Sequence, residues 1–92
     1  MALKVITFYQ EGCTGCEEQT PILRETEDAL GIEIEEIDAV RNPRYIKEYS
    51  LRVTPTTLVI EDGEVRERME GFVRREDLEA AIRRHLPEPL PR

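Results

Sequence analysis

Hydrophobic and polar positions along this chain predict strands and helices in alternation. Residues 3–9 (LKVITFY) are rich in β-branched and aromatic side chains, which is typical of a central strand covered on both faces. After a short loop, residues recur at the spacing of one helix face: Ile22, Leu23, Thr26, Ala29 and Leu30. Gly31 favours the end of this helix, and Pro21 predicts a bend inside it, because proline removes a backbone hydrogen bond.

The middle of the chain predicts an edge strand and a short helix. Residues 32–37 (IEIEEI) alternate imperfectly, as in a strand near the edge of a sheet. Asn42 suits an N-cap and Pro43 suits the first helical position, so we expect a helix to begin here. This helix should turn three side chains inward: Tyr45, Ile46 and Tyr49.

The second half of the chain predicts a hairpin and a last helix. Residues 57–61 and 64–70 flank the pair Asp62-Gly63, which is typical of a hairpin turn. One face of the outer strand is expected to carry charges that protect a sheet edge: Glu64, Arg66, Arg68 and Glu70. The last helix is expected over 74–86, with one apolar stripe: Leu78, Ala81, Ile82 and Leu86.

The predicted order is therefore β-α-β-α-β-β-α within one domain, residues 1–86. The strand-helix-strand start implies a parallel pair, to which the hairpin adds antiparallel strands, so the expected class is α/β with a mixed sheet. Residues 87–92 are rich in proline and cannot continue the helix, so we expect a short C-terminal tail there.

Charge narrows the range of partners. The chain has 92 residues and a net charge of −7, so phosphate backbones and anionic membrane faces would repel it, and we expect neither as a partner. No apolar run is long enough to span a membrane, and the start MALKVITFYQ lacks the pattern of a secretory signal, so a cytoplasmic location is expected. Because thiols are kept reduced there, a cysteine pair is more typical of catalysis or metal binding than of a permanent cross-link.

Cys13 and Cys16 are spaced C-x-x-C at the predicted start of the first helix. As a structural cross-link, so short a loop would contribute only about 2 kcal/mol. A metal site needs about four ligands and the chain has one histidine, so two chains would have to share a zinc ion or an iron–sulfur cluster. A redox pair is the favoured interpretation, and His85, in the last turn of the final helix, is interpreted as structural.

Several motifs resemble the thioredoxin family over nearly the whole chain. The motif C-T-G-C, Pro21 within the helix and Val53-Thr54-Pro55-Thr56 match that family's active-site motif, kink proline and cis-proline loop. The hairpin turn Glu61-Asp62-Gly63-Glu64-Val65 and the groove glycine Gly71 are also similar. The resemblance implies the minimal thioredoxin fold, in which a four-stranded mixed sheet of order 2-1-3-4 has helices on both faces.

The resemblance also implies a thiol–disulfide oxidoreductase that reduces protein disulfides by cycling Cys13 and Cys16 between dithiol and disulfide. Cys13, at the helix start, would attack because backbone N–H groups stabilise its thiolate, and Cys16 would resolve the mixed disulfide. The implied substrate-binding groove is lined by Gly12, Thr54, Pro55 and Gly71. Neither a cofactor nor a metal is implied. The expected partners of this monomer are disulfide-containing proteins and an NADPH-dependent flavoprotein of the thioredoxin reductase type.

The chain departs from the family pattern in three respects. It lacks the N-terminal strand and helix of full-length thioredoxins, so in size it resembles glutaredoxins. Thr7 occupies the position of the buried acid that the family uses in proton transfer from the second cysteine, while Tyr9 and Gly12 replace two tryptophans. The missing acid bears on the rate and pH dependence of turnover, and leaves the nucleophile in place.

Two alternatives remain from the sequence. A glutathione-dependent, glutaredoxin-like enzyme is one, because Thr54-Pro55 could bind the tripeptide backbone and Arg74 and Arg75 could attract its charge. The other is a non-catalytic dimer that binds a metal or an iron–sulfur cluster through the C-x-x-C motif. Acidic residues around the motif oppose anionic glutathione: Glu11, Glu17 and Glu18.

These glutamates also oppose a thiolate at Cys13. At about 8 Å, each would disfavour the charge by roughly 0.5 kcal/mol in water-like screening, and together they could cancel the helix effect. Our hypothesis is a less acidic Cys13, and hence a more reducing couple, than in a typical glutaredoxin.

Overall fold

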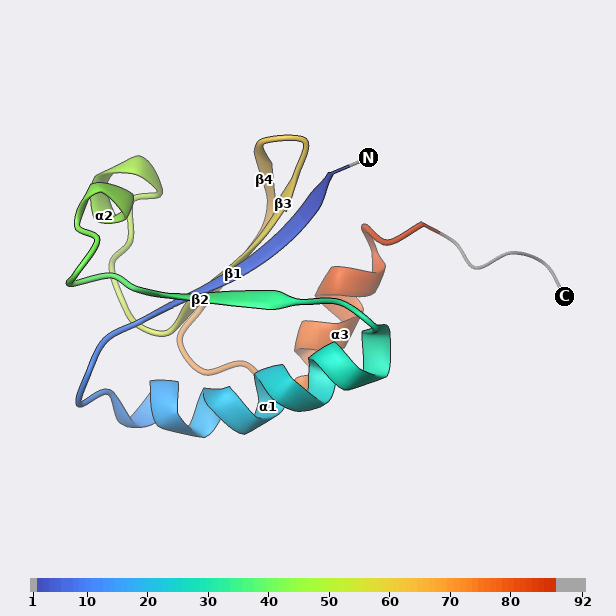
Figure 1. The fold of residues 1–92 in the computed structure, drawn as a ribbon, viewed down its shortest axis with the longest axis horizontal. Coiled ribbons are helices and arrows are strands. Elements are labelled where there is room, and N and C mark those ends of the chain that lie inside the picture. The colour runs from blue at the N-terminus through green and yellow to red at the C-terminus, as the bar shows by residue number, and fades with distance from the viewer. Residues whose placement is uncertain (1, 88–92) are drawn as a thin grey trace, which may run out of the picture.

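The computed structural model describes residues 2–87 of the chain. Within that range the strands are β1 (Leu3–Tyr9), β2 (Ile34–Asp38), β3 (Thr56–Glu61) and β4 (Glu64–Glu70). The helices are α1 (Thr14–Leu30), α2 (Arg44–Glu48) and α3 (Arg75–Arg83). The strands form one sheet of order β2-β1-β3-β4, in which β1 and β2 are parallel and the other pairs antiparallel (Figure 1). The predicted element order and sheet topology are confirmed.

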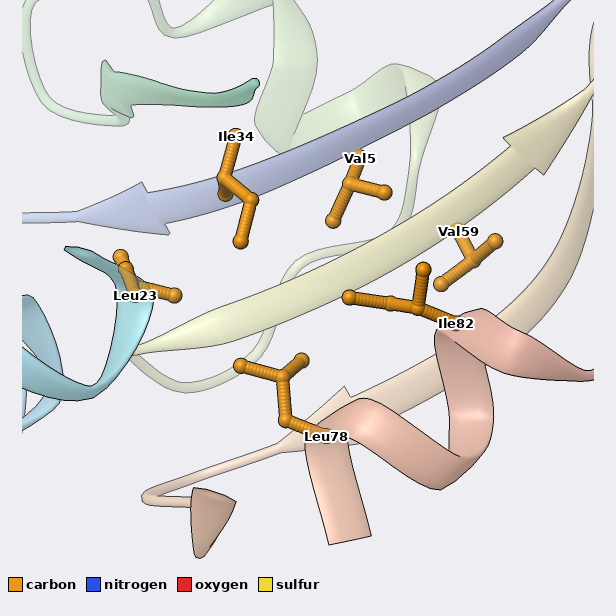
Figure 2. Packing of buried hydrophobic residues seen from close by; sticks show 6 residues of the cluster. All are labelled: Val5, Leu23, Ile34, Val59, Leu78 and Ile82. Carbon is orange, nitrogen blue, oxygen red and sulfur yellow. The ribbon is translucent and has the colours of Figure 1, made fainter. Parts of the chain in front are cut away.

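Helices cover both faces of the sheet, as predicted. α1 and α3 lie against one face, and α2 lies on the other side (Figure 1). Under α1 and α3, side chains from three strands and both helices form a buried cluster (Figure 2): Val5, Leu23, Ile34, Val59, Leu78 and Ile82. This cluster fixes α1, which begins just after Cys13, against the sheet.

A second cluster fills the face under α2: Ile6, Phe8, Ala39, Leu58 and Ile60. Tyr45 of α2 and Tyr49, the C-cap of that helix, pack on Phe8, with ring centroids 5.5 and 5.7 Å from the Phe8 centroid. β1 therefore sends alternate side chains into two buried clusters, which explains why its sequence has so few polar residues.

The end of α1 also sets the start of β2. Gly31 has a φ of 66° and donates its N–H to the Glu27 carbonyl oxygen at 2.8 Å, so the predicted glycine end is confirmed. The Ile32 N–H donates to the same carbonyl at 3.3 Å, so β2 begins at Ile34 rather than at residue 32. Ala29 is exposed, and the predicted helix face is wrong at that position.

α2 differs from the prediction at its start and on its inner face. The helix begins at Arg44, Pro43 is the N-cap, and no side chain caps it. Asn42 instead donates its side-chain amide to the Asp38 carbonyl oxygen at 3.0 Å, in the turn that follows β2. Ile46 is 41% exposed, so the tyrosines alone carry the predicted inward packing of this helix.

β3 and β4 form the predicted hairpin, but a β-bulge divides β4. Val59 pairs with Glu67 whereas Ile60 pairs with Val65, so Arg66 is the extra residue. Because a bulge reverses the alternation of side chains, the prediction that four charges share one face of β4 is wrong. The bulge leaves Glu67 on the same face as the buried Val59, toward α3.

α3 is shorter than predicted and ends at Arg83. The next residues form a turn, in which the His85 N–H donates to the Ile82 carbonyl oxygen at 3.0 Å. Leu86 still packs on the core, so the predicted apolar stripe is confirmed. The predicted tail over 87–92 lies outside the described residues except for its first. No helix within residues 2–87 has the length and apolar character needed to cross a membrane.

Candidate functional site

The two cysteines lie at the start of α1 and are joined by a disulfide bond, with Cα atoms 5.2 Å apart. Cys13 is the N-cap of α1, and its Sγ accepts a hydrogen bond from the Cys16 N–H at 3.2 Å. Cys16 is only 7% exposed, whereas Cys13 is half-buried. Because the first N–H groups of a helix have no partner in the helix, this position favours a thiolate on Cys13 once the disulfide is reduced.

The loop before β3 lies directly beside Cys13. The Thr54–Pro55 peptide bond is cis, as the family resemblance implies. The Thr54 hydroxyl donates to Cys13 Sγ at 3.5 Å, and the Thr54 carbonyl oxygen lies 3.5 Å from the same sulfur. A Cβ atom placed on Gly15 would lie 3.3 Å from Pro55 Cδ, so the C-T-G-C motif and this loop are in close contact.

The two predicted groove glycines take different places around the motif. Gly71, with a φ of 84°, donates its N–H to the Pro55 carbonyl oxygen at 2.7 Å and is thereby attached to the Thr54–Pro55 loop. Gly12, with a φ of 75°, precedes Cys13 and is exposed. The fold therefore joins five of the six predicted site residues in a chain of contacts, and the sixth, Gly12, adjoins them through the backbone of the β1–α1 loop.

Gln19 is a buried polar residue of this site to which the sequence analysis gave no role. Its side chain is fully buried one turn after Cys16. Gln19 Nε2 donates to the Val73 carbonyl oxygen at 3.0 Å, and Gln19 Oε1 accepts from the Val73 N–H at 2.9 Å. The sequence did contain a signal for this role, because Gln19 is a polar residue one turn before Leu23 on the apolar face of the helix.

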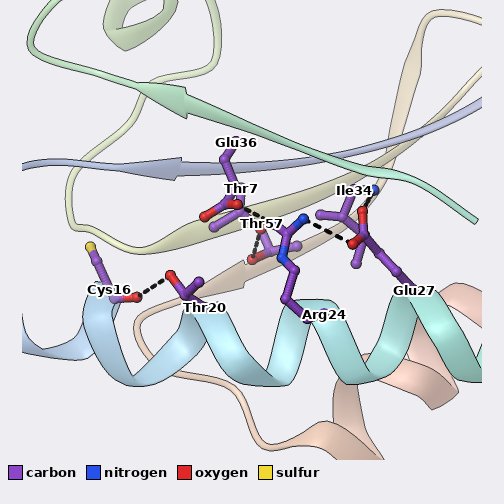
Figure 3. Close-up of polar contacts among 8 residues, drawn as sticks. All are labelled: Thr7, Cys16, Thr20, Arg24, Glu27, Ile34, Glu36 and Thr57. Carbon is purple, nitrogen blue, oxygen red and sulfur yellow. Dashed lines mark hydrogen bonds and ion pairs between the residues drawn. The ribbon is translucent and has the colours of Figure 1, made fainter.

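Behind the cysteines, Thr7 forms a pair with Thr57 in place of a buried carboxylate. Both threonines are nearly fully buried, and their hydroxyl oxygens are 3.0 Å apart (Figure 3). Neither hydroxyl ionises near neutral pH, so this hydrogen-bonded pair carries no charge. The position that the sequence marked as lacking the family acid is therefore neutral.

A pocket of about 330 Å³ lies on the Cys16 side of the site, between the β1–α1 loop, α1 and β2. Thr20 lines it and donates its hydroxyl to the Cys16 carbonyl oxygen at 3.2 Å (Figure 3). Glu36 also lines it and pairs with Arg24, which in turn bonds Glu27. This pocket brings solvent to the side of Cys16.

The acidic residues predicted around the motif are exposed: Glu11, Glu17 and Glu18. Arg41 offsets part of this charge, since its Nη2 lies 3.3 Å from Glu11 Oε1. Both of these side chains are largely exposed, so the pair is weak and screened by salt. The cysteines thus lie at a helix start that favours a thiolate, while the exposed carboxylates close to them in the sequence disfavour it.

No group of three or more potential metal-ligating side chains occurs in the part of the chain that the structure describes. His85 binds Glu67 of β4, with His85 Nε2 2.8 Å from Glu67 Oε2, in keeping with a structural role at the end of α3.

Comparison with known proteins agrees with this geometry. The family model for thioredoxin matches residues 2–84. Thioredoxin of Bacillus subtilis is 33% identical over 81 residues, covering 86% of this chain and 78% of that protein. Thioredoxin 2 of Plasmodium berghei is 32% identical over 84 residues, covering 89% of this chain and 54% of that protein. The X-ray structure of Fasciola hepatica thioredoxin superposes with a TM-score of 0.83 at 26% identity, covering 91% of this chain and 81% of that one.

These matches do not favour the glutathione-dependent or metal-binding alternatives. The fold, the disulfide at the start of α1 and the relatives agree on the same chemistry, exchange between a dithiol and a disulfide. The chain therefore belongs to the thioredoxin family and is a thiol–disulfide oxidoreductase that reduces protein disulfides through its Cys13–Cys16 pair.

Proposed function

We propose that Cys13 is the attacking cysteine and Cys16 the resolving cysteine. The observation that carries this proposal is the difference in access, since Cys13 is half-buried at the helix start while Cys16 is 7% exposed beneath it. In the reduced protein, the Cys13 thiolate attacks one sulfur of the substrate disulfide, and the other substrate sulfur leaves as a thiolate that takes up a proton. The Cys16 thiolate then attacks Cys13 Sγ, which releases the second substrate thiolate. Two electrons pass to the substrate, and the Cys13–Cys16 disulfide forms.

The substrate-binding groove in this proposal is lined by Gly12, Thr54, Pro55 and Gly71. Thr54 supports this role because both its hydroxyl and its carbonyl oxygen lie 3.5 Å from Cys13 Sγ. The glycines contribute by having no side chain, which leaves room for an extended substrate segment beside the sulfur. Thr54, Pro55 and Gly71 would bind the substrate backbone while Cys13 reacts.

We further propose that an NADPH-dependent flavoprotein of the thioredoxin reductase type regenerates the dithiol. The thioredoxin relatives support this electron source. The same proposal takes the protein to act as a cytoplasmic monomer that binds no nucleic acid, and the net charge of −7 supports the last point.

An insulin-reduction assay with two electron supplies tests the function. Precipitation of reduced insulin is expected with NADPH and thioredoxin reductase, and little is expected with NADPH, glutathione reductase and glutathione. Insulin reduction with the glutathione supply but not with thioredoxin reductase would make glutathione the electron donor in place of the flavoprotein. Insulin reduction with neither supply would contradict the proposed function.

Trapping tests the two cysteine roles. Cys16→Ser leaves the mixed disulfide unresolved, so this variant should accumulate covalent complexes with substrate proteins, whereas Cys13→Ser should not. Non-reducing electrophoresis and mass spectrometry identify the linked cysteine. Complexes formed by Cys13→Ser alone would reverse the roles.

A further inference from the structure

We propose that Gln19 is a positioning residue: by holding Val73 it fixes the loop that presents Phe72 to disulfide-bonded protein substrates. This inference rests on the proposed function of the Cys13–Cys16 pair and concerns which disulfides that pair reduces well. Gln19 touches neither sulfur, so its effect passes through the β4–α3 loop, residues 71–74.

The contact between Gln19 and Val73 joins two segments that are far apart in the sequence. Gln19 belongs to α1 and is fully buried. Its amide nitrogen donates to the Val73 carbonyl oxygen at 3.0 Å, and its amide oxygen accepts from the Val73 N–H at 2.9 Å. One side chain thus satisfies both backbone polar groups of one loop residue, which fixes the position and the orientation of that residue together.

The other end of the loop is fixed to the active site by a separate bond. The Gly71 N–H donates to the carbonyl oxygen of the cis residue Pro55 at 2.7 Å. Phe72 stands between the two fixed points, and it is 47% exposed although it is large and apolar. The helix that carries the cysteines, the loop beside Cys13 and the exposed Phe72 are thereby linked through hydrogen bonds.

An apolar side chain in place of Gln19 could fill the same buried space, but it would leave the Val73 N–H and carbonyl without their present partner. Such groups find water or other partners when the backbone moves, so the loop would shift. A protein substrate that places apolar residues near its disulfide would lose contact with Phe72. A small soluble disulfide needs only Cys13 and would lose little. The inferred role is therefore preference for proteins over small disulfides.

The variant Gln19→Met tests this, because methionine is unbranched and of similar length but cannot make either hydrogen bond. Thr26→Val is the matched control: Thr26 lies on the same helix, is fully buried, and its hydroxyl has no hydrogen-bond partner within the described residues. For both variants, KM and kcat are measured with insulin and with the small aromatic disulfide 5,5′-dithiobis(2-nitrobenzoate). Native-state hydrogen exchange of the Val73 amide is measured in parallel.

For Gln19→Met we expect KM for insulin to rise about three- to tenfold and kcat/KM for the small disulfide to stay within about twofold. The Val73 amide should exchange faster than in Thr26→Val. Equal losses of kcat/KM for both disulfides, or an unchanged KM for insulin, would overturn the inference. If the unmodified protein reduces neither disulfide, the proposed function itself fails. Should Gln19→Met not fold, Phe72→Ala takes its place, because Phe72 is 47% exposed; KM for insulin should rise while the small disulfide is little affected, and an unchanged KM would overturn the inference.

A double-mutant cycle with Phe72→Ala tests whether Gln19 acts through Phe72. On the unmodified background, Phe72→Ala should raise KM for insulin by a similar factor. On the Gln19→Met background its additional effect should fall below about twofold, because the ring is already displaced. Fully additive effects would show that Gln19 does not act through Phe72.

Discussion

Glu67 makes the fold sensitive to acid at a position remote from the cysteines. Its carboxylate accepts two hydrogen bonds from Arg84, each at 3.1 Å, and lies 2.8 Å from His85 Nε2. The bonds from Arg84, and then the bond from His85, lower the pKa of Glu67 from 4.5 to about 2. This contact ties β4 to the residues that follow α3, where Leu86 packs against the buried cluster under α1 and α3.

A pKa depressed this far sets an upper limit of about 3 kcal/mol on the contribution of the Glu67 charge to the free energy of unfolding. Because the Arg84 side chain is 59% exposed, solvent screens the pair, and we expect about 1 kcal/mol for replacing Glu67 by Gln. The sign follows from the direction of the shift. Since the pKa is lower in the folded state, the contribution is complete above about pH 4.5 and is lost as the pH falls toward about 2.

Urea unfolding followed by circular dichroism measures the effect, since the chain has no tryptophan to report by fluorescence. Glu67→Gln should unfold about 1 kcal/mol more easily than the unmodified protein near pH 7, with a melting point lower by roughly 4–8 °C. The difference should vanish near pH 2. Glu64→Gln on the same strand, an exposed residue that lies 3.5 Å from Arg66, is the control and should change little. A Glu67→Gln loss that is the same at both pH values would refute the electrostatic explanation.

Three further predictions concern the site and the core. Replacing Glu17 and Glu18 by Gln should lower the Cys13 pKa by about half a unit or more, measured from thiolate absorbance near 240 nm; a value below about 5 in the unmodified protein would contradict the opposing role of these acids. Gly71→Ala places a Cβ on a residue with a φ of 84°, so it should lower the free energy of unfolding in urea by about 1–2 kcal/mol and raise KM for insulin. If both values are unchanged, Gly71 does not line the groove. Leu78→Ala empties a fully buried position and should cost about 2–5 kcal/mol while leaving the Cys13 pKa unchanged; a smaller loss would mean that the core collapses around the cavity.

Local patterns predicted the parts of this fold that depend on neighbours in the sequence. β1 is explained by its own composition, since Val5 and Phe8 enter the two clusters on opposite faces. Gly31 ends α1 where its left-handed backbone conformation is needed. The bulge at Arg66 was not predictable in this way, because it arises from the pairing of β4 with β3 and has no glycine or proline to mark it.

Competing hydrogen bonds explain the errors at helix starts and strand starts. Asn42 has the side chain of a good N-cap, but its amide binds the Asp38 carbonyl in the preceding turn. Ile32 has the composition of a strand residue, but its N–H binds the last turn of α1. In both cases the residue is able to form the hydrogen bond that its type suggests, but a second partner lies within reach. The surrounding fold decides which of the two partners it binds.

The site shows the same division between local and distant determinants. The C-x-x-C spacing alone places Cys13 and Cys16 one helical turn apart, so the reactive pair could be found from the four residues 13–16. The wall of the groove depends on segments that come together only when the sheet forms, since Thr54 reaches Cys13, Pro55 receives the N–H of Gly71, and these contacts span β3 and β4. A motif can therefore identify the chemistry of such a chain, whereas the shape that selects its substrates follows from long-range pairing. Selectivity should accordingly be more sensitive than reactivity to changes that loosen the β4–α3 loop.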